Sequence, residues 1–162
     1  MADLSVTDEL RAYLIASGVV QAQDAPESGV MPSVWIIPIN GAVPGPRDGE
    51  AMTVTLRDTL AKGAATLEAW MIETFVDVIV RSRSEPEATF LQRQILGLIH
   101  PNDAHGGKMN WDMGALRVSY STEWRGDQPL PTADPDNPTY DRVQSFRIAC
   151  RRKALAGTPL AP

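Results

Sequence analysis

The stretch from Thr74 to Ile99 changes from the alternation of a β-strand to the periodicity of an α-helix across one boundary. Its first part, residues 74–81, is rich in β-branched side chains, and these residues favour strands. Val76, Val78 and Val80 fall on one face of that strand. We therefore expect the valine face to lie against the protein core.

The second part of the stretch carries helix signals. Ser84 stands three residues before Glu87, which is the spacing of a capping box. Apolar residues then recur on one helical stripe until His100 and Pro101 end the pattern. The stripe consists of Ala88, Leu91, Ile95, Leu98 and Ile99. The sequence thus predicts a strand packed beside a helix, with no catalytic motif where they meet.

Shorter patterns predict the remaining elements. Ser5 caps an expected N-terminal helix, residues 5–17, and Gly18 stands where its C-terminal cap belongs. Alternating or β-branched runs predict further strands at 34–37, 52–56, 116–122 and 143–152. The strand at 52–56 is able to pair with the strand at 74–81. Proline-rich stretches predict long exposed loops at 38–50 and 125–139, and we expect a helical turn near Lys62.

Together these elements predict an α+β fold. It has about five mostly antiparallel strands, with one main helix and an N-terminal helix packed on the sheet, and long projecting loops. A length of 162 residues suits a single domain spanning 1–162, with a core at 34–152 and a flexible tail at 153–162. The chain shows no apolar run long enough to cross a bilayer and no signal-peptide pattern, so we expect synthesis in the cytoplasm and no membrane partner.

Motifs for nucleotide chemistry are missing from the sequence. It contains neither the P-loop pattern nor the glycine fingerprint of dinucleotide-binding folds. The single Cys150 falls in an alternating strand and is interpreted as a small buried residue instead of a nucleophile. The carboxylates Glu68, Glu73 and Asp77 are interpreted as solvated charges at a sheet edge. We therefore expect no enzyme activity and no cofactor.

One short segment contains possible metal ligands. His100, Asp103 and His105 supply two imidazoles and a carboxylate, which suit a divalent ion. The segment follows a proline break and lacks the helical spacing of zinc proteases. Loop residues without a metal are the favoured interpretation.

Charge is unevenly distributed along the chain. Residues 1–140 contain 10 basic and 19 acidic residues, whereas residues 141–162 contain 5 and 1. An acidic body argues against sequence-specific DNA binding, because such binding depends on neutralised phosphates. The basic end is either a solvated strand end and tail or a contact for phosphate or an acidic neighbouring subunit.

The four tryptophans are candidate interface anchors, because indoles are common at the centres of interfaces. Trp35, within a strand, is expected in the core. Trp111 and Trp124 border the glycine-rich and proline-rich loops, and both interface and core positions remain open for them. Trp70 precedes the long strand and is able to pack a loop tip onto a neighbouring subunit.

The order of these elements resembles the tail terminator, or minor tail-completion, proteins of long-tailed bacteriophages. The likeness is carried by the capped helix, the short strand at 34–37, the proline-rich loop and the strand-to-helix stretch from Thr74 to Ile99. The two late strands, with Phe146-Arg147-Ile148 in the second, also resemble that family.

The resemblance implies a structural virion protein in the tail or neck. It would form a homo-hexameric ring that caps the tail tube, ends its polymerisation and joins the head connector. The implied partners are further copies of the chain, the major tail tube protein and a connector or neck protein, with DNA only as passing cargo. From loop position we expect interface residues at Pro44, Arg47, Trp70, Trp124, Arg125, Asp127, Arg151 and Arg152.

Three other classes of protein stay open. A different head-tail connector or neck-ring adaptor would share the size, the acidity and the missing chemical motifs. A non-viral binding module would be a stable monomer or dimer. A small enzyme would need a pocket in which His100, His105 or Cys150 meets carboxylates.

Overall fold

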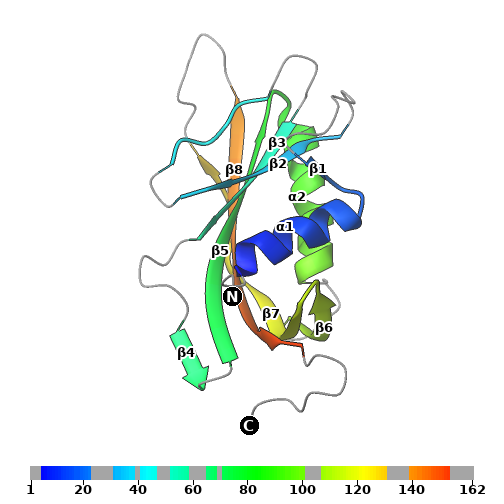
Figure 1. Cartoon of the computed structure of the whole chain (residues 1–162). Coiled ribbons are helices and arrows are strands. Elements are labelled where there is room, and N and C mark those ends of the chain that lie inside the picture. The colour runs from blue at the N-terminus through cyan, green and yellow to red at the C-terminus, as the bar shows by residue number, and fades with distance from the viewer. Residues whose placement is uncertain are drawn as a thin grey trace.

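The described residues of the protein form one mixed sheet and two helices (Figure 1). The computed structural model describes residues 5–22, 31–38, 41–46, 52–58, 65–68, 71–100, 107–130 and 139–153. The helices are α1 (Val6–Ala16) and α2 (Glu85–Ile99). The strands are β1 (Gln21–Ala22), β2 (Ser33–Ile37), β3 (Met52–Asp58), β4 (Ala65–Glu68), β5 (Met71–Ser82), β6 (Lys108–Met113), β7 (Leu116–Leu130) and β8 (Tyr140–Arg152).

The sheet has the strand order β1-β2-β3-β5-β8-β7-β6. The pairs β1–β2 and β2–β3 are parallel and the other pairs are antiparallel, so the expectation of a mostly antiparallel sheet is confirmed. Strand β5 is longer than β3. Along one edge of β5, its first residues pair with β4 and its later residues pair with β3. The β4–β5 hairpin therefore projects beyond the helices at one end of the molecule (Figure 1).

Both helices begin where the sequence indicates, but their caps differ. In α1 the Ser5 hydroxyl accepts a hydrogen bond from the backbone N–H of Asp8 at 3.3 Å. Gly18, at φ +77°, follows the end of this helix in the left-handed conformation that glycine tolerates. The predicted capping box of α2 is wrong, because the Ser84 side chain makes no cap bond. Instead, the Ser84 N–H donates to the Ser82 hydroxyl at 2.9 Å.

The core lies between the helices and one face of the sheet. The predicted valine face of β5 is confirmed, because Val76, Val78 and Val80 are completely buried. The helical stripes of α1 and α2 pack against this face (Figure 1). The other core positions include Leu10, Leu14, Val54, Leu56, Ile95, Val118, Phe146, Ile148 and Cys150.

The number of strands was underestimated. The described residues form eight strands, and the sequence patterns missed β1, β4 and β6. Strands β2, β3, β5, β7 and β8 lie where strands were expected, and β3 pairs with β5 as predicted. The helical turn expected near Lys62 lies outside the described residues.

Both predicted long loops also need correction. Residues 125–130 are not loop but the end of β7, paired with β8 through several register shifts. Residues 41–46 are not a free projecting loop, because side chains of the sheet donate to their carbonyls. Thr53 donates to the Pro44 carbonyl at 3.0 Å, and Arg81 donates to the Val43 carbonyl at 2.7 Å. The parts at 47–50 and 131–138 lie outside the described residues.

Neither helix in the described ranges combines the length and the apolar character that a bilayer crossing requires.

Cys150 is completely buried, as the alternation of its strand predicted. Burial raises the pKa of its thiol to about 11. Because the thiolate is the reactive species, we expect a thiol reagent at pH 8 to label the native protein at least about 100-fold more slowly than the urea-unfolded protein. Cys150→Ser should abolish labelling in both states, and equal rates for native and unfolded wild-type chain would contradict the buried position.

Candidate interaction surface

The sheet face opposite the two helices carries most of the polar side chains of the central strands. In β5 the residues that alternate with the valines point to this helix-free face, and Asp77 and Arg81 are two of them. Their cross-strand partners are Arg57 of β3 and Asp141 of β8. This face therefore presents charges where the other face presents the core.

Three buried carboxylates on this face are each paired with an arginine of an adjacent strand. Asp77 accepts from Arg57 at 2.9 Å and also from the Ser145 hydroxyl. Asp141 accepts from two nitrogens of Arg81, at 2.9 and 2.8 Å. Such two-bond pairing fixes the geometry of both groups. The third pair joins Glu73 to Arg147.

Glu73 is the centre of a small cluster on the helix-free face. Its Oε2 accepts from Arg147 at 2.6 Å and from the Tyr120 hydroxyl at 2.7 Å. The Arg147 guanidinium also lies over the Tyr120 ring, 5.4 Å from its centroid. Burial alone would raise the pKa of Glu73, but the bonds from Arg147 and Tyr120 outweigh it and hold that pKa below its usual value. Burial and the bond to Glu73 raise the pKa of Tyr120.

The lowered pKa makes a prediction about stability and pH. A carboxyl group whose pKa is lower in the folded chain contributes stability above its unfolded pKa, and this contribution disappears as the pH falls through the folded value. We expect Glu73→Gln to cost about 1 to 2 kcal/mol of unfolding free energy at pH 7, because a charge-assisted bond becomes neutral. The deficit should shrink as the pH falls below the ordinary glutamate pKa and through the lowered folded value, because wild-type Glu73 then also becomes protonated. Urea titrations of both proteins at pH 7 and pH 3 provide the measurement, and a deficit independent of pH would argue against the assignment.

An aromatic pair, half-buried Phe75 and exposed Trp124, lies on the same face. The Phe75 and Trp124 rings pack edge to face, with centroids 5.1 Å apart and an interplanar angle of 77°. Trp124 nevertheless remains 53% exposed, and Arg125 beside it is exposed as well. We call Phe75, Trp124 and Arg125 the aromatic patch. A rigidly supported indole next to an arginine is the kind of group that anchors protein interfaces.

The predicted interface residues do not form one cluster. Trp124 and Arg125 fall together in the aromatic patch, and Asp127 follows them in β7. Arg151 and Arg152 lie at the far end of β8, opposite Arg117 and Leu116 in register. Pro44 lies on the segment held by Thr53. Arg47 and Trp70 lie outside the described residues.

Some predictions about single side chains are wrong. Glu73 and Asp77 are not solvated sheet-edge charges, because β5 is an interior strand and both side chains are buried against arginines. Trp35 is only half-buried, with its indole N–H donating to the Ser33 hydroxyl at 2.9 Å. For Trp111, both an interface and a core position were open. Trp111 belongs to the core, and its indole N–H donates a hydrogen bond to the Ser121 hydroxyl at 3.0 Å.

Of the three possible metal ligands, only His100 lies among the described residues. The Nδ1 of His100 accepts from the backbone N–H of Glu123 at 2.9 Å, which joins the end of α2 to β7. Asp103 and His105 lie outside the described residues. Within the ranges that the structure describes, no group of three or more histidine, cysteine or acidic side chains is arranged to hold a metal ion.

Sequence reasoning missed two members of this surface. Tyr120 was assigned to a strand but not to a site, and Arg147 only to a strand within the basic end of the chain, because their contact with Glu73 joins three separate strands. Phe75 did carry a signal, as a large aromatic residue on the strand face opposite the valines.

In comparisons with known proteins, no family model matches the chain and no curated protein matches it significantly.

Proposed function

We propose that this chain is a structural virion protein that caps the end of a phage tail tube as a homo-hexameric ring. In this role it ends tube polymerisation and forms the surface that joins the head connector. The observation that carries the proposal is the aromatic patch, where Trp124 is exposed on a rigid sheet and supported by Phe75. Supported, exposed indoles of this kind are common anchors of subunit contacts.

The chemistry of the helix-free face also favours assembly over catalysis. Its buried carboxylates Glu73, Asp77 and Asp141 are each bound to an arginine. A carboxylate already bound to a guanidinium in a structural ion pair is not free to act as a general base toward a substrate. The pairs instead stiffen the strands that present the aromatic patch.

Charge is compatible with a conduit for DNA. The chain has a formal net charge of −5, and like charge keeps a passing polymer from adhering to the wall of a channel. The partners in this proposal are other copies of the chain, the major tail tube protein and a connector or neck protein. DNA passes through the lumen as cargo.

The proposal is tested by native mass spectrometry across concentration, followed by negative-stain imaging with purified tail tubes and, separately, with purified head connectors. Closed rings of six copies on tube ends are the expected result. Rings that bind the connector but ignore tubes would favour a neck adaptor. A chain that stays monomeric and binds neither structure would contradict the proposal and favour an unrelated binding module.

A further inference from the structure

A second exposed aromatic ring lies on the opposite side of the molecule. Phe90 of α2 is 64% exposed, whereas Ala88, Leu91 and Ile95 of the same helix face the core. An exposed phenylalanine off the apolar stripe contributes nothing to this core. Phe90 and Trp124 are the two most exposed aromatic rings among the described residues, ahead of Tyr140 at 43%, and they lie on opposite faces.

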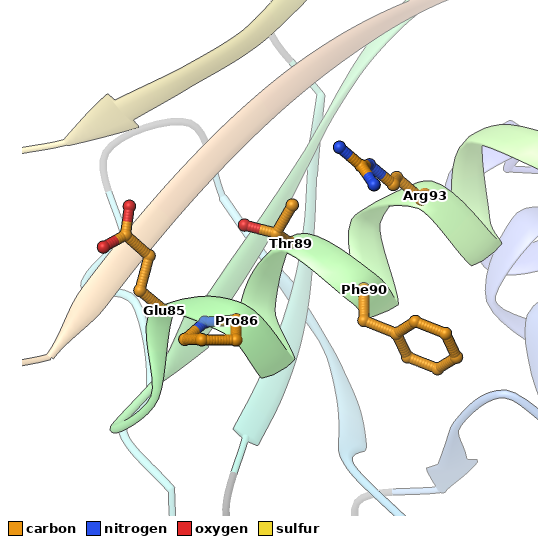
Figure 2. A pocket seen from close by; sticks show the side chains of 5 residues that line it. All are labelled: Glu85, Pro86, Thr89, Phe90 and Arg93. Atoms are coloured by element: carbon orange, nitrogen blue, oxygen red, sulfur yellow. The ribbon is translucent and has the colours of Figure 1, made fainter.

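Phe90 borders a hollow on the outer side of α2. The hollow has a volume of about 460 Å³ and is lined by Glu85, Pro86, Thr89, Phe90 and Arg93. Figure 2 shows these side chains along the first turns of the helix, with Glu85 and Arg93 toward the two ends. We call these five residues the helix hollow. Apolar walls with a few charged groups are typical of surfaces that receive a side chain, and the volume is sufficient for an indole ring.

The positions of the two surfaces determine the kind of contact they can make. The aromatic patch lies on the helix-free face of the sheet, while the helix hollow lies on α2, which packs on the other face, and Glu85 at one end of the hollow pairs with Arg142 of β8 at 3.4 Å. One surface therefore cannot contact the other within the same molecule. When a patch meets a different patch on the next copy, the contact is heterologous and builds a ring or a filament.

The charges beside the two rings are complementary. Arg125 adjoins Trp124, and it is exposed. Glu85 and Glu87, both exposed, form the acidic first turn of α2 beside the hollow. Glu85 pairs with Arg142 of its own chain, and Arg93 adds a positive charge to the lining of the hollow. Complementary charges around an apolar anchor set the orientation and the partner of a contact.

We propose that Trp124 of one copy inserts into the helix hollow of the next copy, against Phe90, with Arg125 facing Glu85 and Glu87. This contact rests on the proposed ring and identifies the two surfaces that would form it. A second copy of this chain is the occupant, since each copy carries both complementary surfaces.

Two variants that each lose one surface provide the test. Phe90→Glu disrupts the helix hollow and leaves the aromatic patch intact. Trp124→Glu disrupts the aromatic patch and leaves the helix hollow intact. We expect each variant alone to remain monomeric under conditions in which the wild-type chain assembles. An equal mixture should form a heterodimer with one copy of each variant, because one intact contact remains possible. Native mass spectrometry distinguishes this species, since the two variants differ in mass.

A charge exchange gives an independent measurement. Arg125→Glu should weaken wild-type assembly at least about tenfold, and adding Glu87→Arg in the same chain should restore it, with Glu85 left in place because it pairs with Arg142. Variants that assemble like the wild type, or a mixture that yields no heterodimer, would overturn the pairing of surfaces while the ring itself still forms. Wild-type chain that makes no ring, even on tail tubes, would overturn both the pairing and the proposed function.

Discussion

Replacing Phe146 with alanine is expected to lower the free energy of unfolding by about 3 to 5 kcal/mol. Phe146 is completely buried in β8, opposite Val76 of β5, and it belongs to the core between the sheet and the helices. Truncation removes its apolar surface from the core and leaves a cavity that the paired strands cannot close. Urea denaturation followed by circular dichroism gives the free energy, with an unchanged m-value as the sign that unfolding stays two-state.

The same substitution at Phe90 is the matched control. Phe90 is exposed on α2, so Phe90→Ala should change the unfolding free energy of the monomer by no more than about 0.5 kcal/mol. Alanine also has the higher helix propensity, which favours a small gain. Equal losses at the two positions would contradict the placement of the core.

Replacing Asp141 with alanine is expected to cost about 2 to 4 kcal/mol of unfolding free energy. The Asp141 side chain is only 6% exposed, and its two bonds to Arg81 are the main compensation for burying the guanidinium. Without the carboxylate, Arg81 retains its bond to the Val43 carbonyl but loses its counter-charge. The free energy is measured at pH 7 by the same urea titration.

Asp112→Ala is the comparison for that pair. Asp112 is 54% exposed and forms its ion pairs with Arg117 and Lys153 at the molecular surface. Water and salt screen such pairs, so we expect no measurable loss of stability. If Asp112→Ala destabilised the protein as much as Asp141→Ala, burial would not be what distinguishes the two ion pairs.

The parts of the fold that sequence reasoning predicted are those where one side is buried and the other polar. The valine alternation of β5 and the apolar stripe of α2 were readable because burial repeats with the period of the backbone. Strand β6 was missed because three of its six residues are exposed. Its two buried residues, Trp111 and Met113, are too few to indicate a strand by alternation. The two residues of β1 are too few to form a pattern.

The errors in the candidate site have a different cause. Residues 125–130 contain glycine and proline, which favour a loop, but pairing with β8 overrides this local preference. Glu73 was interpreted as solvated because its partner Arg147 lies far away along the chain. Only the strand order, which places β8 beside β5, brings these two residues together.

The position of β8 also has a consequence for how the protein folds. Strand β8 lies between β5 and β7, although it follows both along the chain. A nascent chain without residues 140–152 would leave two long strand edges unpaired, and such edges invite aggregation. Closing the sheet also joins residues distant in sequence, which slows folding. We therefore expect the native sheet to form only after β8 has emerged from the ribosome.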